Sequence, residues 1–347
     1  MIARDYTESA LPNKGFTRAN ERCHDEAMRT LVLGKADLSR LATTELAVEA
    51  VEGAFAAFGR GEAEMPAKVY LSIDDHDGDF RAMPSRIGDL AGIKWVNVHA
   101  HNPSRYGMPA VMGVYILNDA RNAFPLAVMD GTLLTALRTG AAGAVASKYL
   151  GPAKPATIGL IGCGVQARTL LASHRVLFDD LKVLAADRSE PRAAGFVAEL
   201  GGRAVSLEEA AGADIVCTAT PSRAPLLQSA WLKEGAHVNA MGADAPGKQE
   251  LAPEILDRAA VYIDDPHQAE GSGEINVPIR TGRFSLDRIA GTLGEVVADK
   301  LPRPEAGTTT VFDSTGLAIQ DLALASAIHQ AAMREGLGAE IDLVGLG

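Results

Sequence analysis

A glycine-rich turn between an apolar strand and a helix constrains the fold of this chain more than any other feature. Residues 156–161 form an unbroken apolar run, and Gly162-Cys163-Gly164-Val165-Gln166-Ala167 follows it directly. Gly162 allows a tight turn, Gly164 lets the backbone approach a pyrophosphate, and Ala167 permits close contact between helix and strand. A helix that begins here points free N–H groups at the phosphates. The pattern therefore predicts a dinucleotide-binding turn that includes Val165 and Gln166.

An acidic residue stands near the expected distance from this turn. Asp187 ends the apolar run 181–187, and it lies 23 residues after Gly164 (187 − 164), where a spacing of about 20 is typical. A carboxylate at this place accepts hydrogen bonds from ribose hydroxyls and repels a 2′-phosphate, which favours NAD(H). The neighbouring Arg188 could hold that phosphate, so NADP(H) remains the alternative cofactor.

Further apolar runs follow the turn and alternate with helical segments. The expected strands are 204–205, 214–220, 237–241 and 260–264, and the expected helices include 192–200 and 207–211. Continuous apolar runs are typical of strands buried on both faces. The second half of the chain, 141–314, is therefore predicted to be a Rossmann domain with a doubly wound parallel sheet. Asp244 follows the 237–241 strand, at the sheet edge where such folds bind ligands.

The first half of the chain has a different pattern. A helix is predicted at 44–59, short β-rich runs at 69–73, 80–83, 93–98, 111–117 and 126–129, and another helix at 132–150. Because no long helix separates these runs, an antiparallel or mixed sheet is favoured. The amphipathic last helix, 318–335, is expected to return to this half. The predicted α/β fold therefore joins the Rossmann domain to a discontinuous α+β substrate-binding and dimerisation domain, residues 28–140 and 315–347. Residues 1–27 are predicted to be an N-terminal arm, either loose or packed on a partner subunit.

Composition excludes several classes of protein. The net charge of −11 argues against a nucleic-acid partner, and no run of about 18 apolar residues indicates a membrane span. Residues 1–27 lack the apolar stretch of a secretory signal, and the three cysteines form no C-x-x-C pair. A cytoplasmic location is therefore expected. His99 and His101 lack an adjacent third ligand, which favours a polar loop, and no metal is expected.

Four cations in the first half interrupt otherwise apolar segments. They are Lys68, Arg81, Lys94 and Arg138. A cation inside an apolar element is costly unless it meets an anion. Together they predict a pocket for a small carboxylate, which arginine can grip through two parallel hydrogen bonds. The alternative is that each side chain reaches solvent or pairs with a local acid.

Seven segments together resemble the ornithine cyclodeaminase/mu-crystallin family, and within it most nearly the archaeal-type alanine dehydrogenases. They are RAMP at 81–84, IKWVN at 93–97, ALRTG at 136–140, IGCGVQA at 161–167, NAMGADAPGK at 239–248, GEIN at 273–276 and VFDSTG at 311–316. The resemblance implies a substrate and dimerisation domain beside a Rossmann domain, and a homodimer joined through the β-rich half.

The same resemblance implies roles for individual residues. Lys94 and Arg138 are expected to hold the substrate carboxylate, with Arg81 and Lys68 beside them, and Asp244 is expected to be the acid/base. Ser314 and Gly316 are expected near the nicotinamide, and Thr139 and Thr220 are further candidates for cofactor contact. Lys94 is also a candidate catalytic group, because neighbouring cations depress the pKa of a lysine.

This chain departs from the sequence pattern of two groups within the family. Cyclodeaminases carry a glutamate at the position of Arg81, where it receives the distal ammonium of ornithine, and a cation there would repel ornithine. Mu-crystallin-like proteins lack a carboxylate at the position of Asp244. The expected activity is therefore reversible, NAD-dependent oxidative deamination of a small L-amino acid, L-alanine to pyruvate and ammonia. The alternatives are an ornithine cyclodeaminase, a ketimine or pyrroline-carboxylate reductase, and a non-enzymatic ligand binder.

Overall fold

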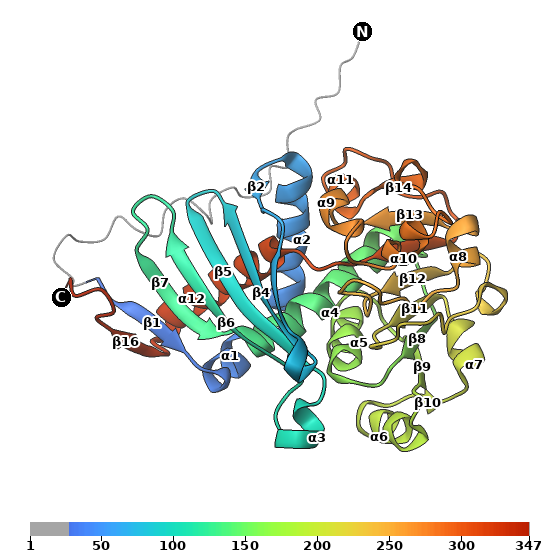
Figure 1. Ribbon diagram of the computed structural model, residues 1–347, viewed down its shortest axis with the longest axis horizontal. Coiled ribbons are helices and arrows are strands. Elements are labelled where there is room, and N and C mark those ends of the chain that lie inside the picture. Colours follow the sequence, from blue (N-terminus) through green and yellow to red (C-terminus); the bar gives the residue numbers. More distant parts are fainter. Residues whose placement is uncertain (1–27, 347) are drawn as a thin grey trace, which may run out of the picture.

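Two eight-stranded sheets and the helices around them make up the computed structural model, which describes residues 28–346 (Figure 1). The predicted N-terminal arm lies outside the described residues. The predicted α/β fold is confirmed, whereas the domain boundaries stay a prediction. The helices are α1 (Lys35–Leu41), α2 (Thr44–Arg60), α3 (Asn102–Tyr106), α4 (Gly131–Leu150), α5 (Val165–Leu177), α6 (Glu190–Leu200), α7 (Leu207–Ala211), α8 (Pro253–Arg258), α9 (Pro266–Ala269), α10 (Asn276–Arg280), α11 (Leu293–Val297) and α12 (Ala318–Glu335). Short 3-10 turns occupy Asp74–His76, Ser229–Trp231 and Leu286–Arg288.

The first sheet is mixed, with a single parallel pair, β1 with β7. Its strand order is β16-β1-β7-β6-β5-β4-β2, and β3 pairs with β4. The bounds are β16 (Ala339–Ile341), β1 (Thr30–Leu33), β7 (Pro125–Asp130), β6 (Val111–Asp119), β5 (Leu90–His99), β4 (Gly78–Ile87), β2 (Ala63–Glu64) and β3 (Val69–Ile73). Strands β4 and β5 are longer than the sequence indicated, because they continue to a tight hairpin at Gly88 (φ +56°).

The second sheet is entirely parallel, as expected for a doubly wound fold. Its order is β10-β9-β8-β11-β12-β15-β13-β14. The bounds are β10 (Arg203–Ala204), β9 (Lys182–Ala186), β8 (Thr157–Ile161), β11 (Ile215–Thr218), β12 (His237–Ala240), β15 (Thr310–Asp313), β13 (Ala260–Ile263) and β14 (Ile289–Thr292). The sequence analysis did not assign β14 or β15 to this sheet. Because β15 lies between β12 and β13, residues 314–316 emerge at the same sheet edge as Asp244.

Helix α4 leads from the last antiparallel strand of the first sheet into the parallel sheet, and it packs against α2, α5 and α12. The side chain of Asp130 begins the helix by accepting hydrogen bonds from the N–H groups of Thr132 and Leu133. Two helical glycines make its contact with α5 possible. A Cβ on Gly140 would lie 2.4 Å from the backbone of Thr169, and one on Gly143 would lie 2.5 Å from Leu170. Glycine at these two positions therefore lets α4 and α5 pack closely.

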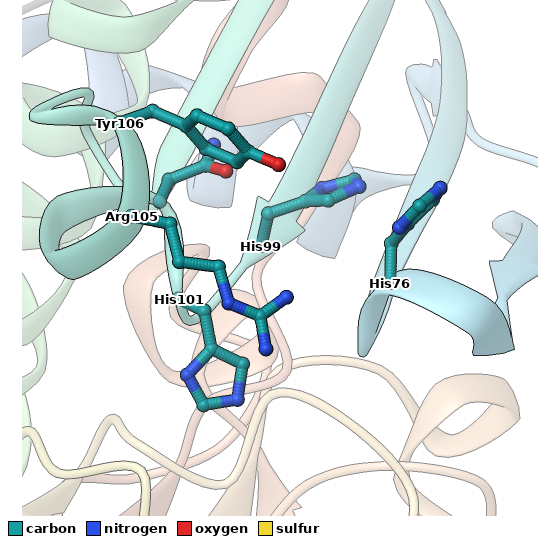
Figure 2. Close-up of a pocket in the computed structure, with 6 residues that line it drawn as sticks. His76, His99, His101, Arg105 and Tyr106 are labelled. Carbon is teal, nitrogen blue, oxygen red and sulfur yellow. The ribbon is translucent and has the colours of Figure 1, made fainter.

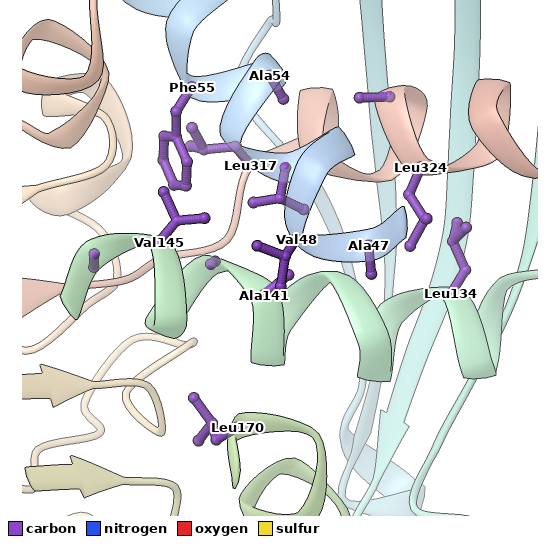
Figure 3. Packing of buried hydrophobic residues seen from close by; sticks show 14 of the residues in the cluster. Ala47, Val48, Ala54, Phe55, Leu134, Ala141, Val145, Leu170, Leu317 and Leu324 are labelled. Atoms are coloured by element: carbon purple, nitrogen blue, oxygen red, sulfur yellow. The ribbon is translucent and has the colours of Figure 1, made fainter. Parts of the chain in front are cut away.

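The main core lies where α2, α4 and α12 meet (Figure 3). Figure 3 labels ten of its buried side chains: Ala47, Val48, Ala54, Phe55, Leu134, Ala141, Val145, Leu170, Leu317 and Leu324. Helix α12 also packs against β4 and β5, so charged residues on that helix can meet charged residues on those strands. Within residues 28–346, no helix is both long and apolar enough to cross a membrane.

Candidate active site

The dinucleotide turn between β8 and α5 has the backbone that its sequence predicts. Gly162 has a φ of +93°, and a Cβ there would lie 2.8 Å from the carbonyl oxygen of Ala219. Gly164 precedes the first turn of α5, and a Cβ on it would meet only open space. Val165 is 66 % exposed and Ala167 is buried. The N-terminal end of α5 is therefore open to a phosphate group, while its next turn packs tightly.

Asp187 is tied to this turn by backbone hydrogen bonds. Its Oδ2 atom accepts from the N–H of Cys163 at 2.8 Å, and its Oδ1 atom accepts from the N–H of Ser189 at 2.8 Å. Each oxygen keeps a lone pair for a ribose hydroxyl. Arg192 lies 3.8 Å from the carboxylate, and Arg188 is exposed. The residues at the end of β9 therefore fit the ribose of a dinucleotide.

The other predicted cofactor residues lie at the same edge of the parallel sheet, except Thr139, which is buried on α4. Thr220 follows β11, and Ser314 and Gly316 follow β15. The buried carboxylate of Glu250, which the sequence analysis did not select, holds Thr220 by accepting from its N–H and its hydroxyl, both at 2.7 Å. Glu250 also accepts from the N–H of Gly242 at 2.8 Å, so it connects the ends of β11 and β12.

Lys94 and Arg138 converge on one carboxylate that the sequence analysis missed. The Nζ atom of Lys94 lies 2.8 and 2.7 Å from the two oxygens of Asp321, and Nε of Arg138 lies 3.2 Å from Oδ1 of the same residue. Lys94 and Asp321 are completely buried. Burial and the positive charge of Arg138 lower the pKa of Lys94 to about 7, although Asp321 opposes this shift.

Two neighbours shape the space beside Arg138. Gly316 has a φ of +78°, and a Cβ there would lie 2.7 Å from Nη1 of Arg138. The same Nη1 atom donates to Oε1 of Gln320 at 3.2 Å. The Nε2 atom of Gln320 is buried and has no hydrogen-bond partner within the part of the chain that the structure describes. A polar donor therefore remains available next to the two cations.

Arg81 and Asp244 connect the two sheets. Nη1 of Arg81, on β4, lies 2.9 Å from Oδ2 of Asp244, which follows β12. The rest of the Arg81 guanidinium binds Asp79 on its own strand, with distances of 3.0 and 2.9 Å. Nζ of Lys248 lies 2.5 Å from Oδ1 of Asp244. Although burial opposes ionisation of Asp244, the positive charges of Arg81 and Lys248 hold its pKa well below the usual range.

Lys68 reaches the segment that leaves β15. Its Nζ atom donates to the carbonyl oxygen of Thr315 at 2.5 Å. The buried carboxylate of Asp264 fixes the same segment by accepting from the N–H and hydroxyl of Thr315 and from the N–H of Gly316, each at 2.7 Å. Burial lowers the pKa of Lys68 to about 8, against the attraction of Asp264. Lys68 is therefore also placed between the first sheet and the parallel sheet.

The predicted cations thus lie together, but three of them already have acidic partners. Asp79 and Asp244 pair with Arg81, while Asp321 pairs with Lys94 and Arg138. Pairing with a local acid, the alternative considered for each cation, occurs at Arg81 with Asp79, whereas Asp244 and Asp321 are distant in sequence from the cations that they bind. One signal in the sequence could have revealed Asp321, because it is an acid within the apolar stretch 317–325 of a predicted helix.

The two histidines that the sequence analysis considered line a separate surface pocket (Figure 2). Its volume is about 180 Å³, and it is lined by His76, His99, His101, Asn102, Arg105 and Tyr106. None of the predicted catalytic or substrate-binding residues lines it. Across residues 28–346, no three side chains of His, Cys, Asp or Glu are grouped so that they could hold a metal ion.

Comparisons with known proteins agree with this architecture. The model of the ornithine cyclodeaminase/mu-crystallin family matches residues 28–336. The alanine dehydrogenase of Archaeoglobus fulgidus is 45 % identical over 320 residues, which are 90 % of this chain and 98 % of that protein. The solved structure of an archaeal alanine dehydrogenase dimer with bound NAD superposes with a TM-score of 0.87 at 44 % identity, covering 91 % of this chain and all of the other. Δ1-pyrroline-2-carboxylate reductase of Thermococcus litoralis, solved with NADH and L-proline, gives a TM-score of 0.85 at 31 % identity, covering 90 % of this chain and all of the other. This chain belongs to the ornithine cyclodeaminase/mu-crystallin family.

Proposed function

We propose that this protein is an NAD-dependent amino-acid dehydrogenase that converts L-alanine, NAD⁺ and water reversibly into pyruvate, ammonium, NADH and a proton. The observation that carries this proposal is the contact between Arg81 of the first sheet and Asp244 of the parallel sheet. It brings a carboxylate and a group of cations to the sheet edge at which a Rossmann fold binds nicotinamide. The similarity to alanine dehydrogenases over nine-tenths of the chain supports it.

In this proposal, buried donors fix the substrate carboxylate. Lys94, Arg138 and the free Nε2 atom of Gln320 lie together, and Asp321 holds the two cations in place. A carboxylate fixed by several donors leaves the Cα hydrogen with one orientation, which is how positioning lowers a barrier. Bound NAD⁺ supplies the oxidant that takes this hydrogen with its electron pair. Asp187 supports NAD rather than NADP, because its carboxylate repels a 2′-phosphate.

Asp244 then accepts and donates protons while water hydrolyses the imino acid. Its carboxylate is the acidic group nearest to Arg81 from the parallel sheet, and it accepts a proton from the water that adds to the imino carbon. Asp244 returns this proton to the amine nitrogen, and the C–N bond breaks as the new hydroxyl loses its proton, so that pyruvate forms and ammonium leaves. Because Arg81 and Lys248 keep the free carboxylate ionised, it is ready to act as a base when the substrate arrives.

The direct test is an assay of the purified protein with single amino acids and each cofactor, followed at the absorbance band of the reduced nicotinamide. L-alanine with NAD⁺ is expected to produce NADH, and pyruvate with ammonium is expected to consume it. NADP⁺ is expected to give slower turnover, because Asp187 repels a 2′-phosphate. L-ornithine that yields proline and ammonium without net NADH would instead indicate a cyclodeaminase, and L-proline as the preferred substrate would indicate a pyrroline-carboxylate reductase.

We also propose that two copies of the chain pair through the outer face of the first sheet. Helices α4 and α12 pack on the face that carries Lys94, so alternate residues point the other way. These include Trp95 on β5 and its neighbours Val114 and Ile116 on β6, all of them exposed. An apolar patch of this kind marks an interface. The archaeal alanine dehydrogenase structure that this chain resembles is a dimer, which supports a second copy as the occupant.

Negatively charged side chains introduced on this face of the sheet are expected to separate the two copies of the chain. Trp95→Glu combined with Val114→Glu should convert a dimer into a monomer, as measured by light scattering after size-exclusion chromatography. Met333→Glu is the control, because Met333 is also an exposed apolar residue but lies on α12. A wild-type protein that elutes as a monomer, or a double variant that stays dimeric, would contradict this assignment.

A further inference from the structure

Lys248 is a largely buried cation beside Asp244, and the proposed reaction gives it no contact with the substrate or the cofactor. Its side chain is 16 % exposed, and its Nζ atom binds Oδ1 of Asp244, four residues earlier in the same loop. A buried lysine is costly unless it meets an anion. Asp244 satisfies that requirement, so the two residues form a local pair within the loop that follows β12.

The backbone on both sides of Lys248 is fixed. The buried amide of Asn276 accepts a hydrogen bond from the N–H of Gly247 at 3.0 Å and donates one to the carbonyl oxygen of Lys248 at 3.1 Å. One residue later, the N–H of Gln249 donates to the carbonyl oxygen of Ser222 at 3.1 Å. The ammonium group of Lys248 is therefore presented from a rigid backbone, unlike that of a lysine on a free surface.

The two oxygens of Asp244 have partners of different kinds. Lys248 holds Oδ1 from the same loop, whereas Arg81 holds Oδ2 from the first sheet. Arg81 does not depend on Asp244 for its own position, because two of its nitrogens bind Asp79. A substrate that enters between the two sheets can therefore exchange the contact at Oδ2, while the contact at Oδ1 remains.

We propose that Lys248 is a positioning residue for the acid/base step, which holds Oδ1 of Asp244 so that Oδ2 faces the substrate and remains a carboxylate. This inference rests on the proposed function, because it assigns Asp244 to proton transfer. Lys248 itself need not contact the substrate. If Lys248 served only to fold the loop, its removal would leave the ionisation of Asp244 unchanged.

The direction of the expected pH effect follows from the charges that face Asp244. Burial favours the neutral acid, and Arg81 and Lys248 favour the carboxylate. Once the substrate carboxylate partly neutralises Arg81, Lys248 is the cation that keeps Asp244 ionised. Removal of Lys248 therefore raises the pKa of Asp244, and the acidic limb of the pH profile moves to higher pH.

Lys248→Met tests this link. Relative to wild type, kcat/KM for the amino acid is expected to fall by a larger factor at about pH 5 than at about pH 9, with a difference of about threefold or more between the two. The KM for NAD⁺ should change by less than about twofold, since the dinucleotide turn lies on other strands. Lys248→Arg should restore the wild-type profile, and Lys300→Met, at an exposed lysine, should leave it unchanged. A uniform loss at every pH would overturn the proposal.

A second readout does not depend on turnover. In protein labelled with ¹³C at aspartate carboxylates, the Asp244 signal can be assigned by its loss in Asp244→Asn and followed during acid titration. It should titrate at higher pH in Lys248→Met than in wild type, and Lys248→Arg should again restore it. If the signal titrates identically in Lys248→Met and wild type, the inference is wrong, even where alanine is oxidised. If the shift occurs but alanine is not oxidised, the proposed function alone fails.

Discussion

Replacing Asp244 by asparagine is expected to lower kcat for amino-acid oxidation by about 10³-fold, within the range that a general acid/base contributes. Asparagine keeps the size of the side chain, but its amide cannot accept a proton. The dinucleotide turn and Asp187 lie at β8 and β9, so binding of NADH should change by less than about threefold. Single-turnover rates and NADH fluorescence titration measure the two effects separately.

The matched control is Asp89→Asn, at an exposed aspartate in the turn between β4 and β5. It should retain wild-type activity. Equal turnover by wild type and Asp244→Asn across the accessible pH range would remove Asp244 from the chemistry. Loss of NADH binding in Asp244→Asn would instead assign the residue to cofactor binding.

Replacing Asp321 by leucine is expected to reduce the free energy of unfolding by about 3–5 kcal/mol, the usual cost of removing one partner from a buried ion pair. The change leaves Lys94, which is completely buried, and Arg138 without their shared carboxylate. Denaturant unfolding of the two proteins measures the difference. The KM for the amino acid should also rise, because the two cations lose the group that aligns them.

A double variant shows whether the loss of stability in Asp321→Leu comes from the unpaired charge of Lys94 or from the changed shape of the side chain. In Lys94→Met combined with Asp321→Leu, the lysine charge is removed together with its partner, so the double variant should be more stable than Asp321→Leu alone. Unlike Asp321→Leu, for which a raised KM is expected, the double variant should be inactive, because the substrate carboxylate would lose Lys94. If Asp321→Leu is as stable as wild type, then Asp321 does not hold these two cations in the folded protein.

The parts of the fold that were predictable from sequence are those governed by local rules. The turn at Gly162–Ala167 needs particular residues at fixed spacing, and helix α2 carries an N-cap and apolar periodicity over several turns. Strand β15 was not assigned from its sequence, in which only Val311 and Phe312 of the four residues are apolar. Its place between β12 and β13 depends on how the sheet assembles.

The residues of the site also include some that were predictable from sequence and some that were not. Cations within apolar segments could be recognised, because each is unusual in its own surroundings. Their partners could not, since Lys94 and Asp321 are 227 positions apart and Arg81 and Asp244 are 163 apart.

The structure changes the electrostatic surroundings expected for Arg81. It lies between Asp79 and Asp244, and the repulsion of ornithine expected from an isolated cation is weakened by these two acids.

In the proposed reaction, groups from both sheets direct the Cα hydrogen of a small amino acid to the nicotinamide. The assay described above tests this most directly when it is run with L-alanine carrying deuterium at Cα. The expected products are NADH with one deuterium at C4 of the nicotinamide and unlabelled pyruvate. Deuterium that appears in water, or an absence of NADH formation with alanine, would contradict the account.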